Sequence, residues 1–273
     1  MLKTIHQGTA HRSSAESPDM ITFEQALEAS QAPFIQQIDF SAFREPDMIN
    51  LILQRSEIIR DLPRSGRIVK AWTEGDEKPI RAAVEQIGDE LVRRAAAIIW
   101  LEYLQIKPAL EKIAPRSIAD IGCGYAVFDL FAWQDFPGRL LLIDIEESEE
   151  RHFGFRDSGA AYTSLEVARQ FLLDNGVSAD DIVTVNPQQN DLSQLEQVDL
   201  AVSFISCGFH YPCETYAKFF DEGISPDGSI ILDLRKRQAE REMSFLQRYG
   251  AVSTLTDCAY GTGQRVLTRK AAD

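Results

Sequence analysis

The sequence lacks any long run of apolar residues. No uninterrupted apolar stretch approaches the ~20 residues that a membrane-spanning helix requires. The first residues also lack the basic and then apolar pattern of a secretory signal. These two absences predict a cytoplasmic protein that has no membrane partner.

Cysteine is scarce, and its positions are far apart. The four cysteines, Cys123, Cys207, Cys213 and Cys258, lack the closely paired spacing of a zinc site. Disulfide bonds are not expected in a reducing compartment. We therefore predict free thiols and no bound metal.

Basic residues are outnumbered, because 42 acidic side chains stand against 28 basic ones and give a net charge of -14. The negative electrostatic field of such a chain repels the phosphate backbone of nucleic acids. The densest run of basic residues, at 235–237, is short. The composition disfavours a nucleic-acid partner and favours a small-molecule substrate. It leaves the oligomeric state open, with a homodimer among the states it allows.

Three regions follow one another along the 273 residues. Residues 1–20 are polar and are expected to form a flexible leader. Residues 21–115 show helical periods, at 23–27, 48–62 and 80–106, and predict a helical cap. From residue 116 to 273, strand and helix patterns alternate, which is typical of a parallel sheet with crossover helices.

The alternating region contains seven expected strands, at 118–121, 140–144, 182–185, 198–204, 229–234, 251–255 and 264–267. Its expected helices lie at 127–133, 164–174 and 238–249. The last two strands are close enough in sequence to form a hairpin.

The most informative segment is Ile118-Ala119-Asp120-Ile121-Gly122-Cys123-Gly124, an apolar strand that breaks into a glycine turn. A second apolar strand ends at Asp144, twenty positions beyond Gly124. In an open parallel sheet the two strand ends lie side by side, where glycine lets a ligand approach the backbone and an acid accepts ribose hydroxyls. This spacing predicts a nucleoside-cofactor site.

The third glycine of a dinucleotide-binding turn is missing, because Ala126 stands at its position. Asp120 also places a negative charge where a doubly anionic phosphate would approach. A cationic or zwitterionic nucleoside therefore suits the turn better than a dinucleotide does.

This pattern resembles the class I S-adenosylmethionine-dependent methyltransferases, whose first motif reads acid-x-Gly-x-Gly and whose second strand ends in a ribose-binding acid. The resemblance covers residues 117–270. It implies an α/β fold with a seven-stranded, mostly parallel Rossmann-like sheet, helices on both faces and an antiparallel last strand. It also implies S-adenosylmethionine as cofactor, bound by the domain of residues 116–273, with the acceptor under the helical cap.

By the same resemblance, Asp120 lies near the amino or sulfonium end of the cofactor, and the turn lets the cofactor tail pass. Asp144 accepts the two ribose hydroxyls, with Glu146 as a competitor beyond the strand end. Asp191 reads the adenine amine, with Asn190 in reserve, unless Asp191 is a surface loop acid. The complete predicted cofactor site is Asp120, Gly122, Cys123, Gly124, Asp144, Ile145, Asn190, Asp191, Ser203 and Phe204.

The fourth strand leads into Ser206-Cys207-Gly208-Phe209-His210-Tyr211, where the resemblance places the reacting centre. An imidazole titrates near neutrality, so His210 is the candidate base for a substrate hydroxyl, and Tyr211 is a candidate to position the acceptor. The alternative is a histidine that only shapes the pocket. An Asn/Asp-Pro-Pro-aromatic signature is absent, which favours a hydroxyl acceptor, of a sugar or another metabolite, over a nitrogen.

Two other hypotheses remain at this point. The chain could bind the nucleoside without catalysis, as a partner or regulatory subunit. It could also be a nicotinamide-dependent oxidoreductase, although that class usually lacks the closing pair of strands.

Overall fold

The structure is a computed structural model that describes residues 20–146, 163–258 and 261–271. The predicted leader falls outside these residues except for Met20.

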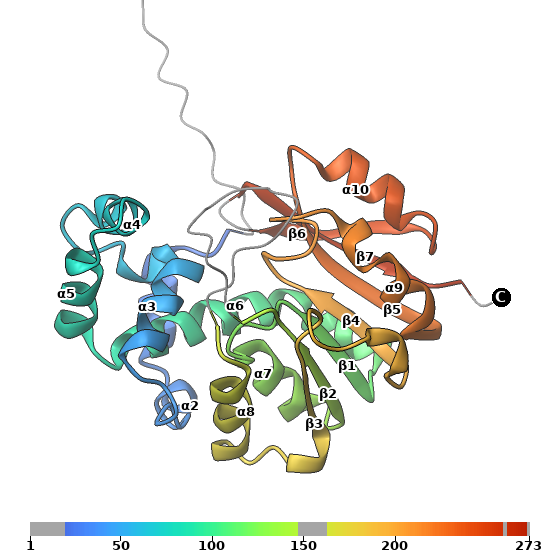
Figure 1. The fold of residues 1–273 in the computed structure, drawn as a ribbon, viewed down its shortest axis with the longest axis horizontal. Helices are drawn as coiled ribbons and strands as arrows, with labels where there is room; N and C mark the ends of the chain where they lie inside the picture. Colours follow the sequence, from blue (N-terminus) through green and yellow to red (C-terminus); the bar gives the residue numbers. More distant parts are fainter. Residues whose placement is uncertain (1–19, 147–162, 259–260, 272–273) are drawn as a thin grey trace, which may run out of the picture.

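The N-terminal region is helical, as predicted, but it is divided more finely. Its elements are α1 (Phe23–Ser30), α2 (Pro33–Gln36), α3 (Glu45–Gln54), η1 (Ser56–Ile59), α4 (Ser65–Thr73), α5 (Lys78–Ile87) and α6 (Glu90–Ile113). The single helical stretch expected at 80–106 is two helices, because Gly88 adopts a φ of 63° and ends α5. Figure 1 shows α2 to α5 grouped beside the sheet, with α6 running from this group to α7.

The sheet has seven strands in the order β3-β2-β1-β4-β5-β7-β6. They are β1 (Ser117–Ile121), β2 (Arg139–Ile143), β3 (Ile182–Val185), β4 (Val198–Ser203), β5 (Ile224–Arg235), β6 (Val252–Cys258) and β7 (Gly263–Arg269). The first five pair in parallel, and β7 inserts antiparallel between β5 and β6. This arrangement confirms the predicted seven-stranded, mostly parallel Rossmann-like sheet with an antiparallel last strand.

Alternate strand residues face two separate cores. Ile118, Leu140 and Val202 pack with α6, α7 (Val127–Asp135) and α8 (Leu165–Asp174). Residues one position along, such as Ala119 and Leu141, pack with η4 (Cys213–Tyr216), α9 (Ala217–Glu222) and α10 (Ala239–Leu246). Burial of each large apolar side chain contributes about 1.5–3 kcal/mol, so helices on both faces stabilise the sheet.

Strand β5 differs from its prediction. It begins at Ile224, five residues before the expected start at 229, because Ile224 pairs with Val198 and the next pair is Ser229 with Leu200. The residues between these pairs bulge out of the ladder, and Asp227 takes a φ of 64°. Short helices η2 (Ala179–Asp181) and η3 (Leu192–Gln194) precede and follow β3 and complete the described elements.

Candidate functional site

The turn after β1 is held tightly against β2. The N–H of Gly122 donates to the carbonyl of Ile143 at 2.7 Å, and Gly122 and Gly124 have φ angles of 75° and 57°. A Cβ on Gly122 would overlap the Ser206 side chain, and one on Gly124 would lie 3.3 Å from Oε1 of Gln54. Glycine is therefore required at Gly122 by both conformation and space.

Asp144 follows β2 and faces this turn. Its Oδ2 accepts the N–H of Gly124 at 3.0 Å, and its Oδ1 accepts the N–H of Glu146 at 3.3 Å. Burial raises the pKa of Asp144 to about 6. Each oxygen keeps a further lone pair, so the carboxylate can still accept two donors from a ligand.

Glu146 serves the fold. Its Oε1 accepts the N–H of Leu165 at 3.1 Å, at the start of α8, and its Oε2 accepts the side-chain amide of Asn186 at 3.3 Å. These bonds occupy the carboxylate and leave Asp144 as the acid that faces the glycine turn.

One cavity of about 680 Å³ lies over the carboxyl ends of the strands. It is lined by residues from the glycine turn, from α3 and α6, and from the segment after β4. Most of the predicted site residues line it: Asp120, Gly122, Cys123, Gly124, Asp144, Ile145, Asn190, Asp191, Phe204, His210 and Tyr211.

Ser203 lies outside this cavity lining. Its hydroxyl is fully buried, donates to the carbonyl of Ile121 at 2.6 Å and accepts the N–H of Cys207 at 2.9 Å. The side chain thus joins the ends of β1 and β4. Its hydrogen bonds hold the end of β1 and the segment after β4 together, and its side chain does not face the cavity.

Asn190 and Asp191 lie at the exposed rim of the cavity. Asp191 accepts the N–H of Ser193 at 3.0 Å and lies 3.6 Å from Nζ of Lys218; the Ser193 bond lowers its pKa. The side-chain amide of Asn190 donates to the carbonyl of Asn186 at 3.0 Å. Both residues are in reach of a ligand, and both already hold local loop structure.

The segment after β4 closes over the glycine turn. The hydroxyls of Ser206 and Tyr211 are hydrogen-bonded at 2.9 Å. Burial and the neighbouring Tyr216 raise the pKa of Tyr211 far above its usual value, so Tyr211 remains a phenol. His210 contacts the ring of Phe209 edge-on, with ring centroids 5.2 Å apart, and also lines the cavity.

Helix α3 docks on the residue that follows the turn. The hydroxyl of Tyr125 donates to Oδ1 of Asp47 at 2.9 Å and accepts the side-chain amide of Asn50 at 3.0 Å. Leu51 and Gln54, one turn further along α3, line the cavity. The N-terminal helices, which were predicted as a cap, therefore form one wall of the site; the residues that hold them there were not predicted.

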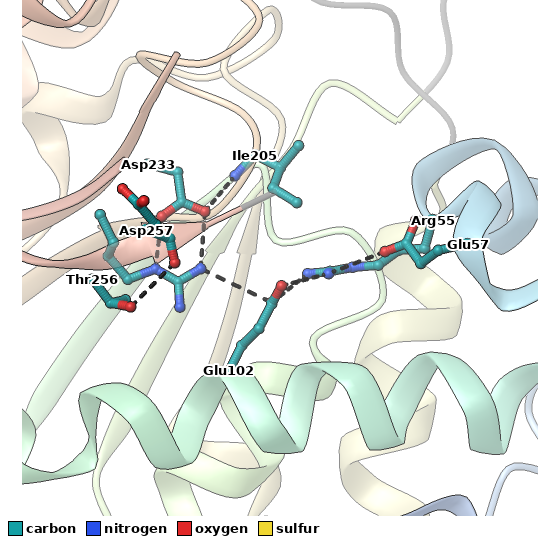
Figure 2. A network of polar contacts seen from close by, with 8 residues as sticks. Arg55, Glu57, Glu102, Ile205, Asp233, Thr256 and Asp257 are labelled. Atoms are coloured by element: carbon teal, nitrogen blue, oxygen red, sulfur yellow. Dashed lines mark hydrogen bonds and ion pairs between the residues drawn. The ribbon is translucent and has the colours of Figure 1, made fainter. Parts of the chain in front are cut away.

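A buried chain of charges crosses from the N-terminal helices to the sheet (Figure 2). Arg55 makes a bidentate pair with Glu102 of α6 at 2.8 and 2.7 Å and lies 3.6 Å from Glu57. Arg265 of β7 lies 3.9 Å from Glu102 and pairs with Asp233 of β5 at 2.6 and 2.9 Å.

The far end of this chain holds the segment after β4. Oδ2 of Asp233 accepts the N–H of Ile205 at 3.2 Å, and Ile205 has a left-handed φ of 52°. The guanidinium of Arg265 lies 4.4 Å from the ring centre of Phe204. Sequence analysis missed this chain, although an acid inside the apolar strand 229–234 and an arginine inside 264–267 were visible signals.

Over the described ranges, no helix is long and apolar enough to cross a membrane, and no group of side chains is arranged to hold a metal ion. All four cysteines are buried and unpaired.

No family model and no curated protein sequence matches this chain. Similar solved structures include an O-methyltransferase family protein from Burkholderia thailandensis, with 10% identity over 82% of this chain and 72% of that one and a TM-score of 0.43. The ribosomal protein L11 methylase of Lactobacillus delbrueckii subsp. bulgaricus has 20% identity over 64% and 80%, with a TM-score of 0.45.

Human N-acetylserotonin methyltransferase in complex with SAM has 10% identity over 83% of this chain and 70% of its own, with a TM-score of 0.44. Likenesses this distant do not establish what the present chain binds. The fold is assigned from the strand order alone.

Proposed function

We propose that this protein transfers a methyl group from S-adenosylmethionine to a hydroxyl of a small-molecule acceptor. The observation that carries the proposal is the cavity that joins the glycine turn and Asp144 to aromatic and aliphatic side chains beside α3 and α6. A nucleoside and an acceptor can share such a volume, since ligand sites commonly measure about 300–1,000 Å³.

The residues present fit the cofactor. The glycine turn lines the cavity with backbone alone at Gly122 and Gly124, and Asp144 retains acceptor capacity for two ribose hydroxyls. Asp120 lines the cavity and has a buried oxygen, Oδ1, without a donor among the described residues. When bound, the cofactor supplies a methyl group on a positively charged sulfur, and a nearby carboxylate favours that charge.

The acceptor end of the cavity has aromatic and aliphatic walls, and Arg55, Glu102 and Arg265 of the buried charge chain also belong to the cavity lining. Phe128 and Phe204 pack together with ring centroids 4.6 Å apart, and Leu51 and Ile99 add aliphatic walls from α3 and α6. Such walls exclude water and position a small organic acceptor in line with the transferred group. The N-terminal helices supply this wall, and its presence favours a small-molecule acceptor over a polymer.

We assign His210 as the group that takes the proton from the acceptor hydroxyl, with Tyr211 positioning the acceptor by its hydroxyl. Tyr211 is unsuited to the base role because its phenol keeps its proton, while an imidazole titrates near neutral pH. The hydrogen bond between Tyr211 and Ser206 fixes the phenol beside the glycine turn.

The test is calorimetric titration with S-adenosylmethionine and S-adenosylhomocysteine, followed by transfer of a labelled methyl group to paired hydroxyl and amine acceptors. Binding together with transfer to hydroxyl compounds supports the proposal. Binding without transfer to any acceptor favours a nucleoside-binding protein without catalysis. Binding of NADH with no response to S-adenosylhomocysteine would favour an oxidoreductase.

A further inference from the structure

The side chains of Asp120 and Asp129 are buried behind the glycine turn, and the residues that the structure describes place fewer hydrogen-bond donors around them than their carboxyl oxygens could accept. Asp120 lies in β1 and Asp129 in the first turn of α7, and their side chains are 3% and 0% exposed. Oδ1 of Asp120 and both oxygens of Asp129 are buried and find no donor among the residues described. The two side chains lie within hydrogen-bonding reach of each other.

Two ionised carboxylates cannot hydrogen-bond, because neither carries a proton to donate. They also repel each other strongly in a buried site. One proton held between Asp120 and Asp129 removes both problems, since it supplies the missing donor and leaves a single negative charge.

The surroundings favour this arrangement. Burial raises the pKa of both groups, that of Asp129 to about 7, and the charge of Asp129 raises the pKa of Asp120 further. Asp144 from β2 and Asp233 from β5 also face Asp120 with negative charge, although Arg265 pairs with Asp233. Cys123 lies beside them as a buried thiol whose pKa is raised, so it adds no charge.

We propose that Asp129 is a positioning residue that holds the shared proton, so that Asp120 presents a carboxylate to the positively charged part of the cofactor. The identity of the ligand rests on the function proposed above, whereas the shared proton is a property of the ligand-free chain. Asp129 itself lies outside the cavity lining, and Asp120 lies in it.

The proton balance is simple. Positive charge near Asp120 favours its ionised form, so one proton leaves Asp120 and binds Asp129. The O–H of Asp129 then donates to the Asp120 carboxylate, and the protein neither gains nor loses a proton. Without a group at 129 that can donate, the buried Asp120 would have to keep the proton itself and would stay neutral.

The first experiment compares Asp129→Asn with Asp129→Leu, two variants whose side chains have the same number of heavy atoms. Asparagine keeps an N–H donor, and leucine has none. Calorimetry gives the affinities for S-adenosylmethionine and for 5′-methylthioadenosine, which has the same nucleoside and no positive charge. The uncharged ligand serves as the control that the nucleoside site is intact.

We expect Asp129→Asn to keep the wild-type ratio of the two affinities. Asp129→Leu should lower the affinity for S-adenosylmethionine about tenfold, as loss of one charge-assisted contact implies, and leave 5′-methylthioadenosine unaffected. An unchanged ratio in Asp129→Leu would overturn the proposal. So would an equal loss in both variants, because packing alone would then explain it.

The second experiment uses the ligand-free protein and holds even if Asp129→Leu does not fold. Infrared difference spectra between wild type and Asp129→Asn at neutral pH should show a protonated carboxyl band in wild type alone. Absence of that difference contradicts the shared proton. If the wild type binds neither nucleoside, the proposed function fails. The infrared result still tests whether Asp120 and Asp129 share a proton.

Discussion

In the proposed function, Asp144 is the residue on which cofactor affinity depends most directly. Its two oxygens hold the N–H groups of Gly124 and Glu146, and this fixes the carboxylate beside the glycine turn. A ligand that meets Asp144 therefore finds an acceptor already oriented, and little side-chain entropy is lost on binding.

We expect Asp144→Ala to weaken S-adenosylmethionine binding by about 2 kcal/mol or more, since two charge-assisted hydrogen bonds are lost. Asp144→Asn should lose less, because its amide oxygen still accepts the N–H of Gly124. Isothermal calorimetry measures both. If Asp144→Ala bound S-adenosylmethionine with wild-type affinity, the ribose would not bind at this strand end.

His210 calls for a different measurement, because a base affects turnover and a pocket residue affects binding as well. His210→Gln should lower kcat about 100-fold, within the usual range for a general base, with unchanged cofactor affinity. Tyr211→Phe, which keeps the ring and loses only the hydroxyl, is the matched comparison and should act mainly on KM for the acceptor. If kcat and cofactor affinity fall together in His210→Gln, His210 shapes the pocket and does not move a proton.

At the scale of elements, the sheet and the N-terminal helices were predictable, and the contacts by which these helices form a wall of the cavity were not. Strand β3 matches its predicted range at both ends, because its apolar run has one register that buries it. The sequence did not predict the hydrogen bonds of Glu146 and Ser203 to backbone groups. A polar residue near a strand end has the same sequence pattern whether its side chain contacts a ligand or the backbone.

The N-terminal helices show the same limit more clearly. Their periodicity indicates a buried face but not its partner, so the docking of Tyr125 on Asp47 could not be read from the sequence. The division of the stretch 80–106 at Gly88 was missed because apolar residues continue at helical spacing on both sides. Only the backbone conformation of Gly88 separates α5 from α6.

The buried charge chain connects elements that are distant in sequence, and it supports a prediction on stability. Asp233→Asn should destabilise the fold by about 3–5 kcal/mol, because it leaves Arg265 buried opposite a neutral group. The matched control is Glu196→Gln, which breaks the exposed pair with Arg139 and should cost less than about 1 kcal/mol.

Urea unfolding of the two variants gives both values. Comparable losses would contradict the assignment of a buried role to Asp233. Asp233→Asn should also loosen the segment that begins at Ile205, and faster amide exchange there would report it.

At the scale of the whole molecule, negative charge is gathered at one edge of the sheet. Asp120, Asp144 and Asp233 lie along β1, β2 or β5 at or near the strand ends that face the cavity. Arg265 pairs with Asp233, whereas Asp120 and Asp144 have no cationic partner among the residues that the structure describes. A positively charged ligand in the cavity would therefore relieve a cost that the folded chain carries alone.

That cost predicts how stability depends on pH. Burial raises the pKa of Asp144 to about 6 and that of Asp129 to about 7, and it raises the pKa of Asp120 as well. Above pH 5 the folded chain binds more protons at these sites than the unfolded chain does, so stability falls as pH rises. Each such group contributes a slope of up to about 1.4 kcal/mol per pH unit.

We expect the thermal midpoint of the ligand-free protein to decrease as the pH rises from 5 to 7.5. The decrease should be smaller in Asp129→Asn. The window lies above the range in which Glu102 and Asp135 titrate, because their ion pairs lower the pKa of both. Saturating S-adenosylmethionine should flatten the curve, since its charge stabilises the ionised Asp120. A midpoint that rises with pH in this window would show that the acids at the sheet edge are ionised in the folded chain without cost.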